Sequence, residues 1–212
     1  MWAIRSFETL PSTQIHLVEA IRNGTITEPV VIVAEEQTDG VGSRHNHWAG
    51  GRGNLFASIA VETRSLPDDL PLQSTSIYFA LIAQEALREL GAQVWLKWPN
   101  DLYENDAKIG GVMTQKLKNF FVVGLGINLK KNQNSYRALS TDISALILLN
   151  IFLKRLDQYP KWKDLFSIYR VEFEQHRAFS VHRKDSTISL QNAVLCDDGS
   201  LTIHDERMYS LR

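Results

Sequence analysis

The stretch Lys97-Trp98-Pro99-Asn100-Asp101-Leu102-Tyr103, followed by Lys108-Ile109-Gly110-Gly111, organises this chain. It places two lysines, an Asn-Asp pair and a Gly-Gly pair between apolar, strand-like runs. Charged side chains in such a setting cost stability unless they bind a partner. We therefore interpret the stretch as an anion-binding site. The alternative is a pair of exposed lysines that discourages pairing at a sheet edge.

The spacing of the two lysines allows a more specific prediction. If Lys97 and Lys108 flank one hairpin centred on Leu102-Tyr103, they lie opposite each other across the ladder. Two facing ammonium groups repel each other unless an anion lies between them. This register would favour a bound anion.

Length and composition are those of an ordinary globular protein. With 212 residues, 44% hydrophobic and 22% charged, the chain can form one large domain, or one with a small appendage. A net charge of −1 provides no basic field that would hold nucleic acid. The longest apolar run, Ala145–Ile151, is far shorter than the ~20 residues of a membrane span.

The cysteine content and the N-terminal sequence indicate the cellular compartment. Cys196 is the single cysteine, which rules out an internal disulfide framework and fits a reducing environment. The N-terminus lacks the continuous apolar run of a signal peptide. We expect a cytoplasmic protein without nucleic-acid or membrane partners.

Hydrophobic periodicity predicts a chain of mixed strands and helices. The predicted strands cover Val30–Ala34, Leu55–Val61, Val94–Trp98, Ile109–Leu117 and Phe120–Leu129. The predicted helices run from a cap at Ser12-Thr13 to Asn23-Gly24, over Leu72–Leu90, from a Thr141-Asp142 cap to about Leu156, and over roughly Lys161–Arg177. After Phe179, short segments at Thr187–Leu190, Ala193–Leu195, Leu201–Ile203 and Met208–Leu211, with a turn at Asp197–Ser200, predict a small β appendage.

The almost wholly apolar run Phe120–Leu129 belongs at the centre of the predicted sheet. Gly124 and Gly126 lie two residues apart and face the same side of it, and Asn128 would project from that side too. A strand face without side chains lets another group approach closely. That group is either a ligand or a bulky neighbouring side chain.

Residues 38–54 form a long loop that is rich in glycine. Glycine N–H groups and arginine side chains bind phosphates, and Trp48 offers a stacking face, so the loop suits a nucleotide. A mobile surface loop is the alternative. Zinc binding by His45 and His47 is disfavoured because no further ligand lies at metal spacing. The glycines and arginines concerned are Gly40, Gly42, Gly50, Gly51, Gly53, Arg44 and Arg52.

Two interpretations apply to the hydroxyls that open the first helix. Ser12 and Thr13 can cap it, or they can present a hydroxyl and a free helix N-terminus to a ligand carboxylate.

Together these pieces resemble the biotin protein ligase family. Three motifs occur in the family's order, and the resemblance covers about Pro11–Leu129 well and the rest loosely. Ser12-Thr13-Gln14 is similar to the family's Ser-Thr-Asn, and Gly124-Leu-Gly-Ile-Asn128 to its Gly-x-Gly-x-Asn. Lys97–Asp101, with Lys108–Gly111 downstream, matches its Lys-Trp-Pro-Asn-Asp motif, which is highly specific.

The resemblance implies an α+β fold, with a mixed sheet flanked by helices as in class II aminoacyl-tRNA synthetases. A catalytic domain over residues 1–179 and a small SH3-like β domain over residues 180–212 are expected. It also implies that biotin and ATP, with Mg²⁺, form biotinyl-5′-adenylate. A lysine of a biotin carboxyl carrier domain then accepts the biotin. Since the motifs begin almost at once, we expect no DNA-binding helix-turn-helix and no repressor function.

Nucleotide and catalytic roles follow from the matched positions. Lys108 would bridge the biotin carboxylate and the α-phosphate, and Lys97 would reach phosphate oxygens. Asp101 and Asn128 would hold Mg²⁺, which prefers oxygen ligands and phosphates. The implied ATP-binding residues are Arg44, Trp48 (stacked on adenine), Lys97, Asn100, Asp101 and Asn128.

The biotin-binding positions follow in the same way. Ser12, Thr13 and Gln37 would hydrogen-bond the ureido ring. Gly111, Gly124 and Gly126 would leave room for the two fused rings. Gln14, Gly40, Gly42 and Lys108 complete the implied biotin-binding set.

One departure from the family lies in the glycine loop. The family's Gly-Arg-Gly-Arg-x-Gly-Arg-x-Trp reads here as Gly40–Trp48 with Val41, Ser43 and Asn46 at the three arginine positions. The hypothesis is that Arg44 or Arg52 substitutes and that the intermediate is held less tightly. The rival functions are a lipoate or octanoate ligase or transferase of the same fold, and a non-catalytic biotin- or nucleotide-binding module.

Overall fold

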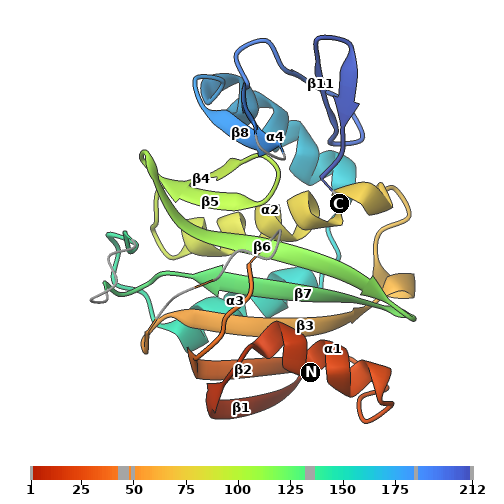
Figure 1. Cartoon of the computed structure of the whole chain (residues 1–212), viewed down its shortest axis with the longest axis vertical. Coiled ribbons are helices and arrows are strands. Elements are labelled where there is room, and N and C mark those ends of the chain that lie inside the picture. Colours follow the sequence, from red (N-terminus) through yellow and green to blue (C-terminus); the bar gives the residue numbers. More distant parts are fainter. Residues whose placement is uncertain (1, 43–47, 49–50, 132–136, 184–185, 211–212) are drawn as a thin grey trace.

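The computed structural model describes residues 2–42, 48, 51–131, 137–183 and 186–210. Within them, a seven-stranded sheet has the order β1-β2-β3-β7-β6-β5-β4 (Figure 1). β1 runs parallel to β2, and the other neighbours are antiparallel, so the predicted mixed sheet is confirmed. The strands are β1 Ala3–Leu10, β2 Val30–Gln37, β3 Leu55–Glu62, β4 Val94–Lys97, β5 Asp101–Glu104, β6 Ala107–Leu117 and β7 Phe120–Ile127.

The central strand is the one that the sequence predicts. β7 is fourth of the seven, and all its residues except Gly126 are buried. An almost wholly apolar strand is stable only with both faces covered, which requires a central position.

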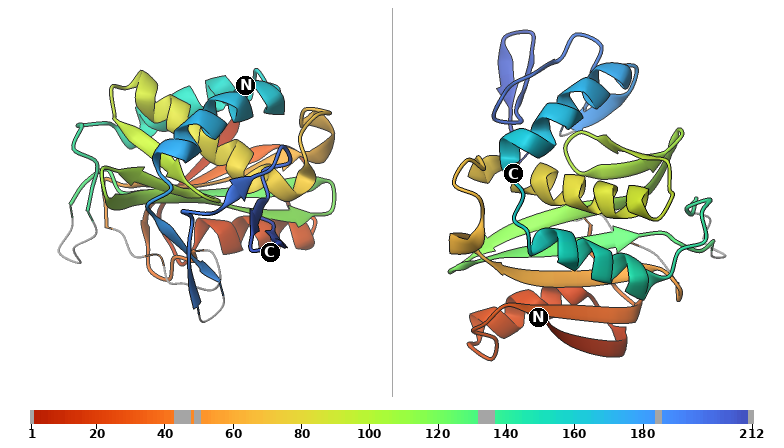
Figure 2. Two further views of the ribbon diagram at one scale, coloured as in Figure 1. Left: turned by 90° about the horizontal axis from the view of Figure 1, so that it is seen from above. Right: turned by 180° about the vertical axis from the view of Figure 1, so that it is seen from behind.

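Helices cover the two faces of the sheet unequally. They are α1 Thr13–Arg22, α2 Thr75–Glu89, α3 Ala145–Leu156 and α4 Trp162–Gln175, with short 3₁₀ turns at Thr63–Ser65 and Leu72–Ser74. α1 lies alone on one face, while α2 and α3 lie on the other (Figure 2). Two apolar clusters result: a small one around α1, including Leu17, Ile21 and Val122, and a large one around α2 and α3.

The boundaries of α1 follow its capping residues. The Ser12 side chain accepts a hydrogen bond from the backbone N–H of Ile15 at 3.4 Å, so the capping interpretation of Ser12 is confirmed. Asn23 closes the helix, and Gly24 follows with φ +75°, a conformation that glycine adopts without strain.

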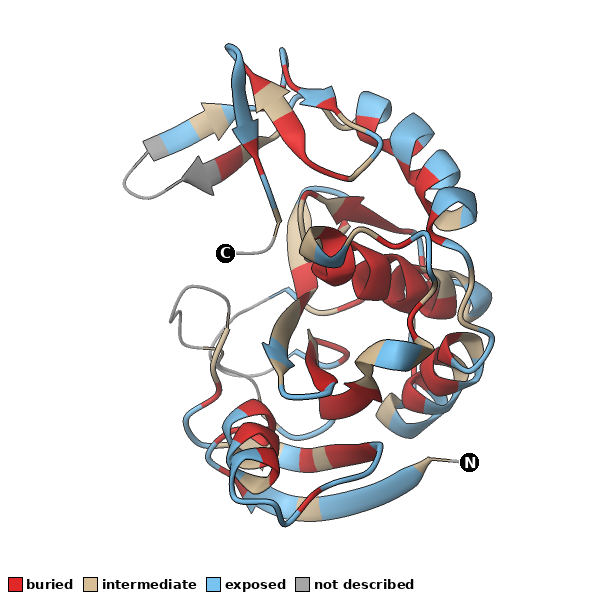
Figure 3. Cartoon of the chain, turned by 90° about the vertical axis from the view of Figure 1, so that its right-hand side faces the viewer, coloured by how far each residue is buried: buried red, intermediate tan, exposed pale blue. Residues whose placement is uncertain are grey.

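Strands β1 and β5 of the main sheet were not predicted, and the predicted start of α3 was wrong. β5, Asp101–Glu104, lies where the centre of a hairpin was predicted. β1 was missed because it is an edge strand whose residues are mostly exposed (Figure 3), so it lacks the apolar pattern of a buried strand. α3 begins at Ala145 after Ser144, and not at a Thr141-Asp142 cap. Asp142 instead forms an ion pair with Lys130.

The C-terminal region consists of short strands beside α4 (Figure 1), and the Trp162 Nε1 of α4 donates to the Asp197 carbonyl at 3.0 Å. The strands are β8 Ser180–Arg183, β9 Ser186–Ser189, β10 Val194–Leu195, β11 Leu201–Ile203 and β12 Glu206–Met208, so β8 was missed and the last strand lies earlier than predicted. Val181, Leu201 and Met208 belong to the large apolar cluster. This region therefore shares the main core, and a domain boundary at residue 180 stays a prediction.

A turn at residues 197–200 connects this C-terminal region to the stretch Lys97–Gly111. The indole Nε1 of the buried Trp98 donates to the Gly199 carbonyl at 2.9 Å. Ser74 Oγ donates to the Asp198 carbonyl at 2.5 Å, and a Cβ on Gly199 would lie 2.6 Å from that Oγ. The tryptophan of the motif thus docks the C-terminal turn.

The Asp198 carboxylate makes this docking depend on pH. Partial burial alone would raise its pKa, but hydrogen bonds from Ser200, Arg207 and Gln73 outweigh burial and lower the pKa to about 2. The pKa of this carboxyl in the unfolded chain is 3.8, so its contribution to folding stability is full above about pH 4 and is lost as the pH falls towards 2.

We expect Asp198→Asn to be less stable than wild type at pH 6, with the difference in stability shrinking near pH 2. Thermal unfolding at both pH values measures it, and a difference that does not change with pH would contradict it.

No helix among the described residues is both long and apolar enough to cross a membrane.

Candidate functional site

A cavity of ≈ 220 Å³ opens on the α1 face of the sheet. Its walls come from the N-terminus of α1, the strands β3, β5, β6 and β7, and parts of the chain between β2 and β3. The lining residues are Thr13, Gln14, Gln37, Val41, Gly42, Trp48, Ala57, Ser58, Asn100, Asp101, Lys108, Gly111, Val112, Met113, Gly124, Leu125, Gly126 and Asn128. Five stretches that are separate in the sequence, within residues 13–14, 37–48, 57–58, 100–113 and 124–128, therefore build one site.

Strand register places the site residues in rows across the sheet. One row joins Lys97, Asp101, Gly111 and Gly126 through successive strand pairs. The next row joins Met113, Gly124 and Ser58. Since paired residues point to the same face, both rows face the cavity side of the sheet.

A β-bulge decides the direction of Lys108. Leu102 pairs with Gly110, but Tyr103 pairs with Lys108, which leaves Ile109 as an extra residue. In a regular ladder Lys108 and Gly111, three residues apart, would point to opposite faces. The extra residue brings Lys108 to the cavity, while Ile109 joins the large apolar cluster.

The predicted register of the two lysines was wrong. Lys97 pairs with Asp101 across β4 and β5, and Lys108 pairs with Tyr103 across β5 and β6. β5 thus lies between the lysines, which belong to two successive hairpins. The nearest anion is the protein's own: Asp101 Oδ1 lies 2.6 Å from Lys108 Nζ.

Lys97 is held by aromatic side chains beside the cavity. Its Nζ donates to the Tyr103 hydroxyl at 3.2 Å and lies 5.0 Å from the Tyr103 ring centre and 5.9 Å from that of Phe179. Burial lowers the pKa of Lys97, with Asp101 acting against this and Lys108 adding to it. Lys97 is absent from the described lining residues, so its contact with phosphate stays a prediction.

Four polar side chains form the floor of the cavity near α1. The Thr13 N–H and hydroxyl donate to Gln37 Oε1 at 2.8 and 3.1 Å. Ser58 Oγ lies 2.9 Å from Thr13 Oγ1 and 3.1 Å from Gln14 Oε1. Gln14 Nε2 also donates to the Val122 carbonyl at 3.4 Å. This network offers several donors and acceptors to a polar ring.

Ser58 is the member of this floor that sequence reasoning missed. It is fully buried within β3, whose other residues are apolar apart from the last. A lone serine in a buried strand was the available signal. Ala57, Val112, Met113 and Leu125 also line the cavity and were not singled out, because apolar residues in strands look like core.

We expect Ser58→Ala to weaken biotin binding about 2- to 10-fold, since one hydrogen bond contributes about 0.5–1.5 kcal/mol. Calorimetric titration with biotin measures this. Ser76→Ala is the matched control, because the buried Ser76 Oγ has no hydrogen-bond partner in the described structure. Equal affinities for Ser58→Ala and wild type would contradict the prediction.

The paired glycines of β7 let side chains approach the sheet. A Cβ on Gly124 would lie 2.7 Å from Gln14 Oε1 and 2.9 Å from Met113 Cγ. A Cβ on Gly126 would lie 2.7 Å from Trp48 Cε2. Both glycines thus accommodate bulky neighbours here, and both also line the cavity.

Trp48 closes the side of the cavity next to Lys108. Its indole rests on Gly126, with Lys108 Nζ 5.6 Å from the ring centre, and its buried Nε1 has no partner among the described residues. Its backbone N–H donates to the Gly40 carbonyl at 2.7 Å. A Cβ on Gly40 would lie 2.4 Å from the Trp48 carbonyl oxygen. Gly40 therefore admits the Trp48 backbone and does not itself line the described cavity.

Asn100 and Asn128 present amides at the same end. Asn100 Nδ2 donates to the Val112 carbonyl at 2.6 Å. Asn128 is buried, and its Oδ1 has no hydrogen-bond partner among the described residues. Asn128 and Asp101 both line the cavity, and their side-chain oxygens are ligands of the kind that Mg²⁺ prefers. The described residues contain no cluster of three or more His, Cys, Asp or Glu that could hold a metal.

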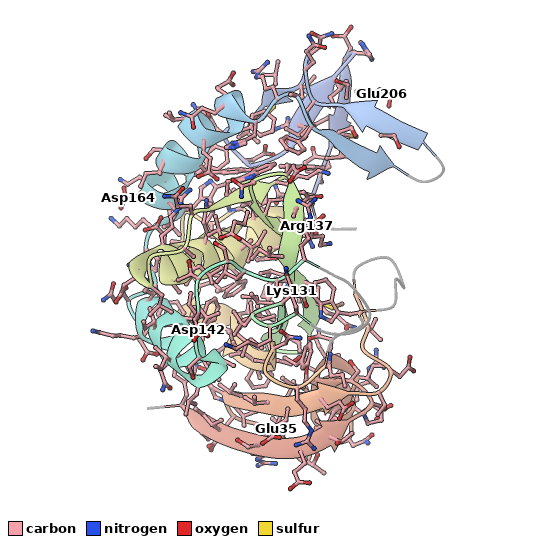
Figure 4. All side chains as sticks on the ribbon, turned by 90° about the vertical axis from the view of Figure 1, so that its left-hand side faces the viewer. Glu35, Lys131, Arg137, Asp142, Asp164 and Glu206 are labelled. Atoms are coloured by element: carbon pink, nitrogen blue, oxygen red, sulfur yellow. The ribbon has the colours of Figure 1, made fainter. Side chains whose placement is uncertain are left out.

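Most predicted site residues thus meet in one cavity, with four exceptions. Ser12 caps α1, and Gly40 and Lys97 lie beside the described lining. Arg44 falls outside the described residues, as do His45 and His47. The proposed substitute Arg52 forms ion pairs with Glu35 at 2.8 Å and Glu36 at 3.7 Å, at the β1–β2 end of the molecule where Figure 4 labels Glu35.

Comparisons with known proteins identify the family of this chain. Residues 6–132 match the model of the Biotin/lipoate A/B protein ligase family. The chain is 37% identical to the biotin acetyl coenzyme A carboxylase synthetase of Helicobacter pylori, solved with bound biotinylated ATP, with a TM-score of 0.94 over 99% of this chain and 100% of that one. The biotin protein ligase of Aquifex aeolicus, in complex with biotin and ATP, is 23% identical, with a TM-score of 0.77 over 100% and 97%.

A curated relative is similar over part of its length. The biotin–[acetyl-CoA-carboxylase] ligase of Mycobacterium tuberculosis is 29% identical over 126 residues, or 56% of this chain. The chain spans 46% of the length of that relative.

Proposed function

The chain belongs to the biotin/lipoate A/B protein ligase family, and from this premise we propose that it attaches biotin to a lysine of a carrier domain at the expense of ATP. The observation that carries the proposal is the cavity itself. It joins a hydrogen-bonding floor, made by Thr13, Gln14, Gln37 and Ser58, to a cationic end at Lys108. A biotin molecule has the matching polarity, with a ureido ring at one end and a carboxylate at the other.

The first step would join biotin to AMP. A carboxylate oxygen of biotin attacks the α-phosphorus of ATP, the bond to the β-phosphate breaks, and pyrophosphate leaves. Two anions must meet, so a fixed cation between them stabilises the transition state. Lys108 supplies it by turning from Asp101, its 2.6 Å partner, towards the incoming carboxylate and phosphate.

The nucleotide would lie beside Trp48, Asn100 and Asn128, which line the same end of the cavity. The Trp48 indole has a face suited to stacking on adenine. Asp101 and Asn128 would hold Mg²⁺ together with the phosphates, and the ion would neutralise charge on the leaving pyrophosphate.

In the second step, the amine of an acceptor lysine attacks the acyl carbon of the adenylate. The new amide forms, AMP leaves, and the amine loses a proton. The acceptor we propose is the biotin carboxyl carrier domain of a biotin-dependent carboxylase. We further propose that residues 1–179 form the catalytic unit and that the β region from residue 180 onward is an appended unit.

ATP–pyrophosphate exchange tests the proposal, first with biotin and then with lipoate. Exchange that depends on biotin supports it, whereas exchange with lipoate alone would make the protein a lipoate ligase. No exchange with either acid would leave a non-catalytic binding module. Transfer of labelled biotin to a carrier domain then tests the second step.

A further inference from the structure

The buried Asn54 joins two backbone segments beside the cavity without lining it. It lies immediately before β3 and is 4% exposed. Its Oδ1 accepts hydrogen bonds from the backbone N–H groups of Leu129 and Lys130, both at 2.8 Å. Its Nδ2 donates to the Gly51 carbonyl at 3.0 Å. One amide thus connects the chain that enters β3 with the chain that leaves β7.

The strand register explains why these segments meet. The last pair of the β3–β7 ladder is Leu55 with Ile127, so Asn54 and Asn128 each stand one residue beyond it. Beyond a ladder the backbone N–H groups lose their partners, and a buried one without a partner is costly. The Asn54 side chain accepts from the N–H groups of Leu129 and Lys130, the second and third residues beyond the end of this ladder.

A second contact holds the same two segments together. Gly53 has φ +88°, and a Cβ on it would lie 3.0 Å from Lys130 Cγ. The aliphatic part of Lys130 therefore packs closely on the glycine backbone.

The position of Asn128 depends on these hydrogen bonds of Asn54. Asn128 directly precedes Leu129 and Lys130, whose N–H groups Asn54 binds. Its own backbone N–H donates to the Ile109 carbonyl at 2.7 Å, and its carbonyl accepts from Leu139 at 2.9 Å. Its side-chain Oδ1 is buried and has no partner among the described residues. The backbone of Asn128 is fully bonded, while its side-chain oxygen stays available to a ligand.

We propose that Asn54 is a positioning residue that holds Asn128 in place for the nucleotide. The inference rests on the proposed function, because it takes ATP as the ligand of Asn128. Loss of the Asn54 amide leaves the N–H groups of Leu129 and Lys130 without their acceptor, so this backbone moves towards solvent or another acceptor. The side chain of Asn128 moves with it, whereas the polar floor near α1 does not.

The test is a double-mutant cycle on nucleotide affinity, with calorimetric titration of ATP plus MgCl₂ and, separately, of biotin. We expect Asn54→Ala to weaken ATP binding about 10- to 100-fold, the usual range for residues that orient a ligand-binding side chain. Biotin affinity should change less than about twofold. In an Asn128→Ala background, Asn54→Ala should have little further effect on ATP, because coupled residues are not additive.

Two further variants distinguish a positioning role of Asn54 from a general contribution to the stability of the fold. Asn54→Asp keeps an acceptor for Leu129 and Lys130 but loses the donor to Gly51, so it should recover most of the ATP affinity. Gln84→Ala is the matched control: the Nε2 of buried Gln84, on α2, donates to the Val94 carbonyl at 3.2 Å, and Gln84 does not line the described cavity. It should lower the thermal midpoint without changing ATP affinity.

Additive losses in the double mutant, equal losses of biotin and ATP affinity, or an Asn54→Asp as weak as Asn54→Ala would overturn the proposal. Biotin-dependent ATP–pyrophosphate exchange, measured on the wild-type protein, distinguishes a failure of the Asn54 proposal from a failure of the proposed function. If wild type does not exchange, the function fails. If it exchanges and the cycle is additive, only the role of Asn54 fails.

Discussion

Lys108→Ala is expected to lower biotin-dependent ATP–pyrophosphate exchange by at least about 10²–10³-fold, because it removes a preorganised cation from the reacting centre. The fold should persist: Lys108 and its partner Asp101 are 39% and 25% exposed, and ion pairs of this kind contribute about 1 kcal/mol or less. Exchange rates and thermal unfolding, measured on the same samples, separate the two effects.

Lys116→Ala is the matched control for this prediction. Lys116 lies on the same strand, β6, is exposed, and does not belong to the described cavity lining. It should exchange like wild type. Full activity of Lys108→Ala would contradict the assignment of the cavity as an adenylating site.

Gly124→Ala is expected to weaken biotin binding about 10- to 100-fold. The added methyl would lie 2.7 Å from Gln14 Oε1 and 2.9 Å from Met113 Cγ, so both side chains must move within the cavity. Overpacking of this kind costs about 1–3 kcal/mol, and here the displaced Gln14 also leaves the polar floor. Calorimetric titration with biotin measures the loss.

Gly91→Ala is the control for the second prediction. Gly91 has φ +87°, and a methyl added there would meet nothing within 4 Å, so alanine strains the backbone after α2 without entering the site. It should lower the thermal midpoint and leave biotin affinity unchanged. Equal biotin affinities for Gly124→Ala and wild type would show that the ligand does not reach this part of the sheet.

The central strand and the ends of α1 could be predicted because their causes are local. The apolar composition of Phe120–Ile127 requires two covered faces, and Ser12 with Gly24 marks the ends of α1. β1 could not be predicted in this way. Its residues are mostly exposed, and it is a strand only because β2 pairs with it.

The residues of the candidate site also fall into two groups: those that the sequence predicts and those that only the structure reveals. About half of the described lining residues belong to the three short motifs and were predictable, since amides, lysines and paired glycines are unusual between apolar strands. Ser58 and Met113 were not, because a strand residue becomes part of a site only through the neighbours that its register provides. Arg52 forms exposed ion pairs with Glu35 and Glu36, so its contact with phosphate stays a prediction.

The residue types of Lys97–Gly111 favour an anion-binding site, and by themselves they leave open the alternative of exposed lysines at a sheet edge. Pairing between strands decides which of the two lysines lines the described cavity. One extra residue, Ile109, turns Lys108 towards Gly111 and Asp101, whereas Lys97 lies against Tyr103 and Phe179. A bulge and a contact with a segment far along the chain come from the packed sheet, because neither has a local energetic signature in the sequence.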